Sequence, residues 1–463
     1  MSAWETVVGL EIHAHLKTRT KMFCRCETSF GEPPNTRTCP VCLAHPGTLP
    51  VPNRRAVEWT IKLGLALGCE IPPRAVFHRK NYFYPDNPKG YQISQYDEPL
   101  CVDGRFTVPG EDGDLEIGIV RAHLEEDAAK TVHLEGAGGR IVGATRSLVD
   151  FNRGGTPLVE IVTQPDLRSA EEARRFLQLL RQTIVELGIS DAEMEKGTLR
   201  CDANVSVRRP GEAYRTRWEL KNMNSFSFIA RGIDAAVRAQ IALHEAGQEV
   251  VQETYDYDAD ADTLTPHRSK EEAEDYRYFP EPDLVPVEPP GELVDRLRGE
   301  LVELPGARIG RHASALGTSD AWALVTTERE PSFDGLVAAG VGSRAAYSFV
   351  MNQPIPERAN LAELARVVME PDLTRASIEG AVSASANPGF TADEFLAQKA
   401  MSDTTELEPL IERILAANPE EVAAYRGGKE GLLGFFVGQA MKETGGKANP
   451  KILNELIREK LKA

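Results

Sequence analysis

Residues 7–16 read V-V-G-L-E-I-H-A-H-L, and their side chains separate by parity. The apolar members share one side: Val8, Leu10, Ile12, Ala14 and Leu16. The polar members share the other: Glu11, His13 and His15. Because a period of two is that of a β-strand, the stretch predicts a strand with one apolar face and one face carrying a carboxylate and two imidazoles. An ordinary half-solvated strand also alternates, but its polar face usually carries Lys, Thr, Glu and Arg, so we favour a functional face.

Residues 200–208, R-C-D-A-N-V-S-V-R, repeat this arrangement. Cys201 and the residues two, four and six positions later are apolar, and Asp202 and Asn204 lie on the opposite side with Arg200. Asp and Asn are poor strand formers. Two strands with such polar faces predict a sheet whose exposed face carries the functional residues.

Length, charge and cysteine usage restrict the class of protein. The 463 residues exceed one hydrophobic core and suggest about three domains. A net charge of −17 argues against a protein that simply coats nucleic acid, although a local basic face remains compatible with it. No apolar run approaches the roughly 18 residues of a membrane span, and no signal peptide precedes the first strand, so we expect a cytoplasmic protein without a membrane partner. Seven cysteines in such a chain do not suggest a disulfide framework.

The composition divides the chain near residue 292 and again near residue 404. The first part mixes short alternating segments with one clear helix, for which Ser169 and Glu172 form a capping box and Gly188 a stop. The acidic run 258–262 predicts a solvated loop. From about Gly291 the apolar residues recur at helical spacing. We therefore expect domains at 1–292, 293–404 and 405–463, of which the last two are helical.

The tail is basic, unlike the rest of the chain. From Arg426 onward it has eight Lys or Arg and four acidic residues. Asn449 and Pro450 predict the start of its last helix. Four of its lysines are candidates for a contact with an anionic partner: Lys429, Lys442, Lys447 and Lys451. An ordinary surface helix pair would show the same pattern.

Four cysteines form two close pairs, C-x-C and C-P-V-C: Cys24, Cys26, Cys39 and Cys42. Two thiolate pairs across a short loop are typical of a tetrahedral zinc site. Such a site is closed by its four sulfurs, so we predict a structural role. The alternative is four reduced thiols that never meet.

Carboxylates inside apolar strands mark a second candidate site. Glu160 interrupts T-P-L-V-E-I-V, and Glu126 follows the apolar positions of I-V-R-A-H-L-E-E, whereas Glu125 continues the phase of His123. Either of these two neighbouring glutamates is able to point inward. Buried carboxylates need a cation or several donors. We predict that Glu11, His13, Glu126 and Glu160 hold a divalent ion and nucleotide phosphates, with Mn²⁺ as an alternative to Mg²⁺ because of the histidine. Separate hydrogen-bonded core groups are the alternative.

The run from Arg79 to Tyr96 contains four tyrosines and one phenylalanine together with basic residues that include Lys80 and Lys89. Aromatics beside cations suit stacking on a base or ribose, with the lysines near phosphate, although a buried loop fits equally. The sequence contains no P-loop or Rossmann motif. It also contains no glutaminase nucleophile, since Cys69, Cys101 and Cys201 lack an elbow motif. Any ammonia that the protein uses must come from elsewhere.

Taken together, these motifs resemble the B subunit of the bacterial tRNA-dependent amidotransferase over nearly the whole chain. The resemblance rests on V-G-L-E-I-H, the residues from Lys80 to Tyr91, H-L-E-E-D, L-V-D-F-N-R-G-G-T-P-L-V-E-I-V, L-R-C-D-A-N-V-S-V-R, E-L-K-N-M-N-S-F, D-Y-R-Y-F-P-E-P-D-L and the tail G-F-F-V-G-Q-A-M-K-E-T-G-G-K-A-N-P. It implies an α+β glutamine-synthetase-like cradle with an antiparallel sheet, an all-helical domain and a small helical tail similar to the YqeY family.

The resemblance also implies a reaction. A protein of this family uses ATP to phosphorylate the side-chain carboxylate of Glu on tRNA-Gln or Asp on tRNA-Asn, and ammonia then displaces phosphate. The amidase subunit of the enzyme supplies the ammonia through a channel, and a small third subunit makes the assembly a heterotrimer. By motif, the family's Mg²⁺ site corresponds to Glu11, His13, Glu126 and Glu160, the channel or phosphate site to Lys80 and Lys89, and the tRNA contact to the tail. The cysteine quartet matches those members that keep zinc.

Two stretches depart from the family pattern. After Q-E-T the family usually continues with basic residues, but Tyr255, Asp256 and Tyr257 follow here. The segment 314–344 is weak in motif and only its helical character carries over. Two other functions remain open on the sequence alone: a stand-alone ammonia ligase like glutamine synthetase, and a non-catalytic zinc-containing tRNA-binding module.

Overall fold

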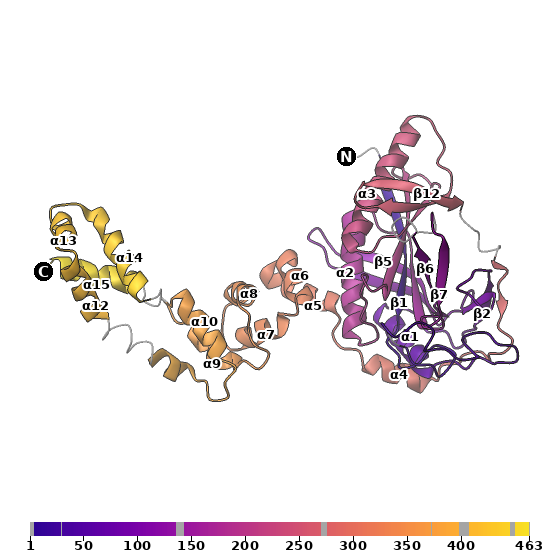
Figure 1. The fold of residues 1–463 in the computed structure, drawn as a ribbon, viewed down its shortest axis with the longest axis horizontal. Coiled ribbons are helices and arrows are strands. Elements are labelled where there is room, and N and C mark those ends of the chain that lie inside the picture. The colour runs from indigo at the N-terminus through magenta and orange to yellow at the C-terminus, as the bar shows by residue number, and fades with distance from the viewer. Residues whose placement is uncertain are drawn as a thin grey trace. The chain divides into compact units, whose positions relative to one another are not determined.

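The structure, a computed structural model, describes residues 4–28, 30–135, 143–269, 276–371, 373–397, 407–444 and 450–462. The chain forms two compact units, Met1–Arg308 and Ile309–Ala463, and each is considered by itself (Figure 1). The domain boundaries expected at 292 and 404 remain predictions. None of the helices in the described ranges is both long and apolar enough to cross a bilayer.

An eight-stranded sheet organises the first unit, in the order β12-β11-β10-β9-β1-β8-β5-β4. Its strands are β1 (Glu5–His15), β4 (Cys101–Val108), β5 (Leu115–Glu126), β8 (Pro157–Thr163), β9 (Leu199–Arg208), β10 (Trp218–Lys221), β11 (Glu253–Asp258) and β12 (Thr263–Ser269). All neighbours are antiparallel except β10 and β11, which are parallel. The α+β class with a largely antiparallel sheet is therefore confirmed.

Two small sheets and helices α1 to α4 accompany the large sheet in the described part of this unit. The small sheets are β13-β2-β3, formed by β2 (His78–Asn81), β3 (Tyr91–Ser94) and β13 (Phe279–Pro280), and the hairpin of β6 (Lys130–Leu134) and β7 (Arg146–Asp150). The helices are α1 (Arg54–Ala66), α2 (Ala170–Glu186), α3 (Phe226–Glu245) and α4 (Gly291–Gly299).

The apolar face of the large sheet is covered by helices. Helix α1 contacts β4 and β5, α2 contacts β4, and α3 contacts β9 and β10; Figure 1 shows α2 and α3 beside the sheet. The rings of Phe106 and Phe176 meet edge to face at 5.7 Å, and the Gln240 amide donates to the Val205 carbonyl at 2.9 Å. Leu10, Ile12 and Ala14 of β1 are fully buried on this face, as their parity predicts. The opposite face is left for the polar side chains.

Helix α2 begins and ends as its sequence predicts. The Ser169 hydroxyl accepts from the Glu172 N–H at 3.1 Å. The Glu172 carboxylate reaches one residue further than a standard capping box and accepts from the Arg168 N–H at 2.6 Å. Gly188 follows the helix with φ of 72°, a conformation that favours glycine.

Within the acidic run 258–262, residues 259–262 form the solvated loop that the composition predicts. Residues 253–258 and 263–269 form the paired strands β11 and β12, and only the connection between them is a loop. The Asp258 carboxylate accepts from the N–H groups of Asp260 and Ala261. Asp262 accepts from the Tyr257 hydroxyl at 2.7 Å. The acidic side chains thus stabilise a turn, because a short Asx motif satisfies its backbone donors.

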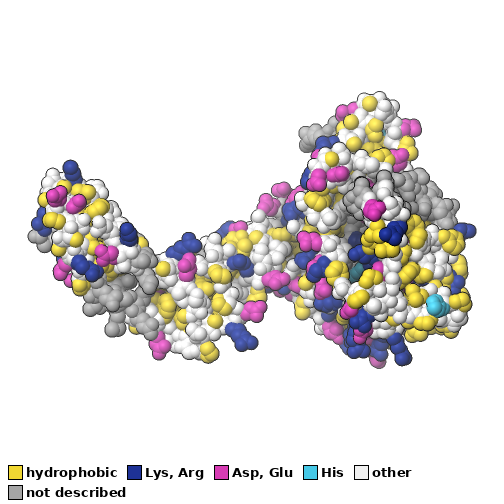
Figure 2. Space-filling view, viewed as in Figure 1, with side chains coloured by type: hydrophobic (Ala, Val, Ile, Leu, Met, Phe, Trp, Pro, Cys, Tyr) yellow, Lys and Arg dark blue, Asp and Glu magenta, His cyan; other side chains and the backbone are white. Residues whose placement is uncertain are grey.

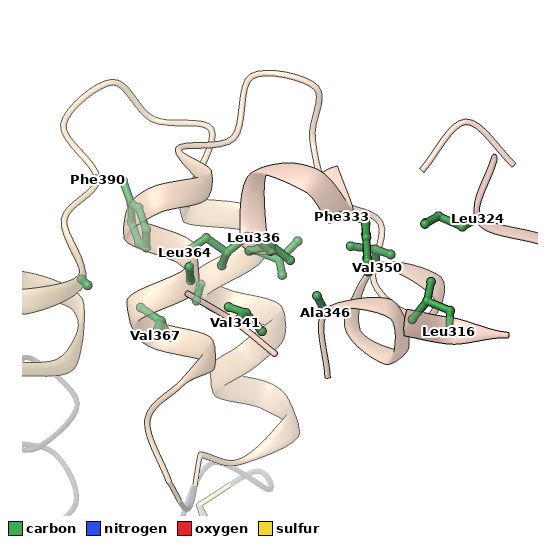
Figure 3. Close-up of a cluster of buried hydrophobic side chains, with 14 residues drawn as sticks. Leu316, Leu324, Phe333, Leu336, Val341, Ala346, Val350, Leu364, Val367 and Phe390 are labelled. Atoms are coloured by element: carbon green, nitrogen blue, oxygen red, sulfur yellow. The ribbon is translucent and has the colours of Figure 1, made fainter. Parts of the chain in front are cut away.

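The described part of the second unit contains helices and no strand. Helix α5 (Pro305–Leu316) crosses the boundary between the units. The others are α6 (Thr318–Thr326), α7 (Glu330–Ala338), α8 (Ser343–Asn352), α9 (Leu361–Val368), α10 (Arg375–Ala384), α12 (Leu407–Ala417), α13 (Pro419–Arg426), the 3-10 turn η3 (Glu430–Leu432), α14 (Leu433–Glu443) and α15 (Pro450–Lys462). They enclose two apolar clusters, one around Phe333, Leu336 and Leu364 (Figure 3) and one around Phe436 and Leu453. The expected helical character of this part is confirmed.

Candidate active site

Three adjacent strands bring the predicted carboxylates and imidazoles together. Strand β8 lies between β1 and β5, so Glu160 is the cross-strand partner of both His13 and His123. Directly opposed residues in antiparallel strands project to the same side. The polar faces of three segments that are distant in the sequence therefore form one surface.

His13 lies at the centre of this surface. Its Nε2 is 3.3 Å from Glu160 Oε2, 3.7 Å from Glu11 Oε1 and 3.8 Å from Glu125 Oε1. His123 Nε2 lies 3.6 Å from the same Glu160 oxygen. We call these residues the acidic cluster: Glu11, His13, His123, Glu125 and Glu160.

The acidic cluster strongly perturbs its own ionisation. Burial lowers the pKa of His13, but the hydrogen bond with Glu160 and the charges of the three glutamates outweigh burial and raise it to about 9. Burial and the charge of Glu160 raise the pKa of Glu125 to about 7, and the same two causes raise the pKa of Glu11. Burial lowers the pKa of His123 to about 4. Burial and mutual repulsion thus disfavour the charged forms of Glu11 and Glu125, whereas the neighbouring imidazoles and Lys80 hold the pKa of Glu160 below its usual value.

The donor set fits a divalent cation. Ligand atoms of Glu11, His13 and Glu160 lie within 4.8 Å of one another, and so do those of His123, Glu125 and Glu160. Carboxylate oxygens are preferred by Mg²⁺ and Mn²⁺, and one imidazole favours the latter. The same negative charges that raise the pKa of His13 would attract a metal ion to this place.

Glu126 does not join the acidic cluster. Its carboxylate pairs with the Lys89 ammonium and accepts from the Ile93 N–H at 3.0 Å. It lies on the opposite side of β5 from His123 and Glu125, because successive strand residues alternate. The geometry therefore separates Glu126 from the ligand set predicted for it and brings in Glu125, whose phase along the strand already matched that of His123.

Lys80 is the basic residue of the aromatic run that faces the acidic cluster. Its ammonium lies 4.7 Å from the centre of the Tyr276 ring. Burial lowers the pKa of Lys80, but Tyr278, Glu125 and Glu160 outweigh it and raise the pKa above its usual value. A lysine that stays charged here suits an anionic substrate group. Lys80 and Lys89, which the sequence analysis assigned to one site, therefore lie in different surroundings, because Lys89 forms an ion pair with Glu126.

A cleft of about 450 Å³ lies at the C-terminal end of β1. His15, two residues beyond His13 on the same face, lines it together with Arg153, three lysines (Lys17, Lys130 and Lys196) and Phe30, which is 76% exposed. The Asp127 carboxylate lies 2.7 Å from His15 Nε2 and 3.0 Å from Arg200 Nη2. Sequence reasoning missed Asp127, although it continues the phase of His123 and Glu125 in H-L-E-E-D.

The four paired cysteines converge on one point. All four Sγ atoms lie within 4.8 Å of one another, and a tetrahedron with Zn–S bonds of about 2.3 Å has sulfurs about 3.8 Å apart. The hydrogen bond from Cys24 lowers the pKa of Cys42 to about 4, whereas burial raises that of Cys26 to about 11. Without a cation, Cys42 is therefore the thiolate and Cys26 stays protonated. A bound metal would allow all four cysteines to ionise, as a zinc site requires.

The remaining cysteines are unsuited to nucleophilic chemistry. Burial raises the pKa of Cys69 to about 12 and the pKa values of Cys101 and Cys201 well above the usual range. A catalytic cysteine requires the opposite shift. These three cysteines are therefore poor candidates for a nucleophile.

Two of the four tail lysines are seen in full, and both are exposed: Lys429 and Lys442. Lys447 lies outside the described residues, and only the backbone of Lys451 is described, in α15. On the visible face of the C-terminal helices, basic and acidic side chains are interspersed (Figure 2). The basic excess of the tail is therefore distributed among acidic neighbours on that face.

Comparison with known proteins gives full-length matches. Residues 6–295 match the GatB/GatE catalytic domain, and residues 350–461 match the GatB domain. The aspartyl/glutamyl-tRNA(Asn/Gln) amidotransferase B subunit of Anaeromyxobacter dehalogenans is 49% identical over 487 residues, which cover 100% of this chain and 99% of that protein. Proteins of the same name from Chlorobium phaeobacteroides and Geobacter sulfurreducens are 46% and 45% identical, with 99% of each chain covered.

Proposed function

The chain belongs to the family of amidotransferase B subunits, and from this premise we propose that its acidic cluster activates the side-chain carboxylate of Glu or Asp carried by a misacylated tRNA. The protein is part of a tRNA-dependent amidotransferase, a glutamine-dependent carbon–nitrogen ligase. Family membership favours this function over both alternatives, the stand-alone ammonia ligase and the non-catalytic tRNA-binding module.

The reaction has two balanced steps. First, an oxygen of the substrate carboxylate bonds to the γ-phosphorus of ATP, the bond from that phosphorus to the bridging oxygen breaks, and ADP leaves. Second, the nitrogen of ammonia bonds to the activated carbonyl carbon, the carbon–oxygen bond to phosphate breaks, and nitrogen loses a proton. Both steps gather negative charge around one phosphoryl group, so the site needs positive charge at that place.

The convergence of three carboxylates on His13 is the observation that carries this proposal. Glu11, His13, Glu125 and Glu160 would hold Mg²⁺ or Mn²⁺. When bound, such an ion neutralises charge on the transferred phosphoryl group. Lys80, whose ammonium lies over the Tyr276 ring, adds a positive charge that interacts with Glu125 and Glu160.

The cleft at the C-terminal end of β1 is our candidate for the base and ribose of ATP. Its volume of about 450 Å³ falls within the usual range of small-molecule sites. Phe30 offers an exposed ring for stacking. Of the three lysines that line the cleft, Lys17 pairs with Asp191 and Lys196 with Glu193, so a phosphate there would compete with these carboxylates. His15, which lines the cleft, lies two residues from His13 on the same face of β1.

Three finer assignments complete the proposal. The four cysteines bind one structural zinc. The tail, from about residue 405, binds the tRNA body through its lysines. Since the relatives are named as subunits, we propose that an amidase subunit joins this chain in the cytoplasm together with a small third subunit, and that ammonia passes from the amidase to the acidic cluster.

The decisive experiment measures phosphate release by the assembled enzyme with ATP, divalent ion and either charged or uncharged tRNA. We expect release with misacylated tRNA only, and its loss in Glu160→Gln. Glu116→Gln is the matched control, because Glu116 is an exposed residue of the same sheet, on β5, and is hydrogen-bonded to Thr107 away from the cluster. Two results would contradict the proposal: phosphate release by the enzyme when free glutamate replaces the charged tRNA, or a rate of release in Glu160→Gln equal to that of the wild type.

A further inference from the structure

Lys21 is the largest fully buried side chain among the described residues, with 0% exposure. Its ammonium donates to Cys42 Sγ at 3.6 Å and to the Phe151 carbonyl at 3.0 Å. No ion pair joins it to a carboxylate anywhere in the described ranges. The only anionic partners available to this lysine there are therefore the sulfurs of the cysteine cluster.

Burying an ammonium without an anion costs several kcal/mol. Four neutral thiols would leave that cost uncompensated, because a thiol sulfur is only a weak acceptor. A divalent metal bound by four thiolates has a net charge of −2, which one buried ammonium partly neutralises. A metal–tetrathiolate centre would therefore compensate the buried charge of Lys21, and Lys21 would in turn stabilise the negative charge of the four thiolates.

We propose that Lys21 is the counter-charge of the metal–tetrathiolate centre and stabilises metal binding through the Cys42 thiolate. This inference rests on the proposed zinc centre. The residue is a positioning residue, since it touches a ligand rather than the metal or a substrate. Outer-shell partners of this kind typically change metal affinity by about 10–100-fold.

The surroundings of Lys21 connect the centre to the active-site strands. A Cβ atom added to Gly155 would lie 3.4 Å from Lys21 Cδ and 3.7 Å from Cys42 Cβ. The Gly155 carbonyl accepts from the Met22 N–H at 2.7 Å, and the Gly155 N–H donates to the Asp127 carbonyl at 2.8 Å. Gly155 precedes β8, which carries Glu160, and Asp127 follows β5, which carries Glu125. The cysteine centre therefore packs against Gly155, which is hydrogen-bonded to Asp127 next to the ends of β5 and β8.

The test compares zinc content and the rate of zinc transfer to a chromogenic chelator in the full-length chain. Lys21→Met removes the charge and the donor, whereas Lys21→Gln removes the charge but keeps a donor for the Phe151 carbonyl. Arg25→Met is the matched control, because Arg25 lies between two of the ligands but is exposed. Circular dichroism and thermal melting establish that each variant is folded.

We expect both Lys21 variants to bind zinc about 10–100-fold more weakly and to release it faster, with Arg25→Met within about twofold of the wild type. Wild-type release from Lys21→Gln would overturn the inference, because the hydrogen bond alone would then account for the lysine. Wild-type release from Lys21→Met would overturn it as well. A wild-type chain without zinc would instead refute the proposed metal centre. If neither neutral variant folds, the Co²⁺-loaded Lys21→Arg chain decides: metal release near wild type supports the charge, and release as fast as from Cys42→Ser overturns it.

Discussion

Replacing Glu125 by Gln is the sharpest test of the acidic cluster. Gln has the shape of a protonated Glu, and the raised pKa of Glu125, about 7, indicates that its protonated form is well tolerated in the fold. The substitution therefore removes one negative charge without leaving a cavity. We expect the folded stability of the variant to equal or slightly exceed that of the wild type, because like-charge repulsion with Glu160 is relieved.

The effect on catalysis follows from the geometry. Ligand atoms of His123, Glu125 and Glu160 lie within 4.8 Å of one another, and one unit charge at about 4 Å contributes about 4 kcal/mol at an effective dielectric constant of about 20. That energy corresponds to roughly a 10³-fold loss in the rate of phosphoryl transfer. The assay is single-turnover formation of ADP with saturating misacylated tRNA, ATP and Mg²⁺.

Glu126→Gln is the matched comparison, because Glu126 is next to Glu125 in the sequence but points to the other side of β5. This neighbouring glutamate faces Lys89 and the Ile93 N–H instead of the cluster. We expect it to lose about 1–3 kcal/mol of folding stability and less than tenfold in rate. The reasoning is refuted if Glu126→Gln abolishes ADP formation while Glu125→Gln retains it.

Three further outcomes are expected. Cys39→Ser should lower the zinc content from about one per chain and loosen the N-terminal region; elemental analysis decides, and a wild-type chain without zinc after growth in added metal would contradict the site. Mn²⁺ affinity should rise as the pH increases towards 9, because a ligating His13 must lose a proton that its raised pKa retains; calorimetry at several pH values would show a flat profile if His13 is not a ligand. Replacing Lys429, Lys442, Lys447 and Lys451 by Ala should raise the KM for tRNA and flatten its salt dependence while changing the turnover number less; an unchanged salt slope would make the tail a solvated surface.

Much of the fold was accessible from patterns within single segments. The parity of residues 7–16 correctly predicted which side of β1 is buried, and the capping residues of α2 correctly predicted its start. The paired spacing of the cysteines predicted their convergence. These features are local, since strand pleat, helix caps and short loops depend on residues only a few positions apart.

The composition of the acidic cluster depended on contacts between segments. Both Glu125 and Glu126 are buried, so burial does not distinguish them, and motif matching selected Glu126, which pairs with Lys89 on the other side of β5 from His123. Only the register of β5 against β8 shows which glutamate shares a face with Glu160. The buried ammonium of Lys21 is invisible in sequence for the same reason, because its partners Cys42 and Phe151 lie 21 and 130 positions away. Charge compensation is a property of distances in space, and strand pairing and loop closure set those distances only after the chain has folded.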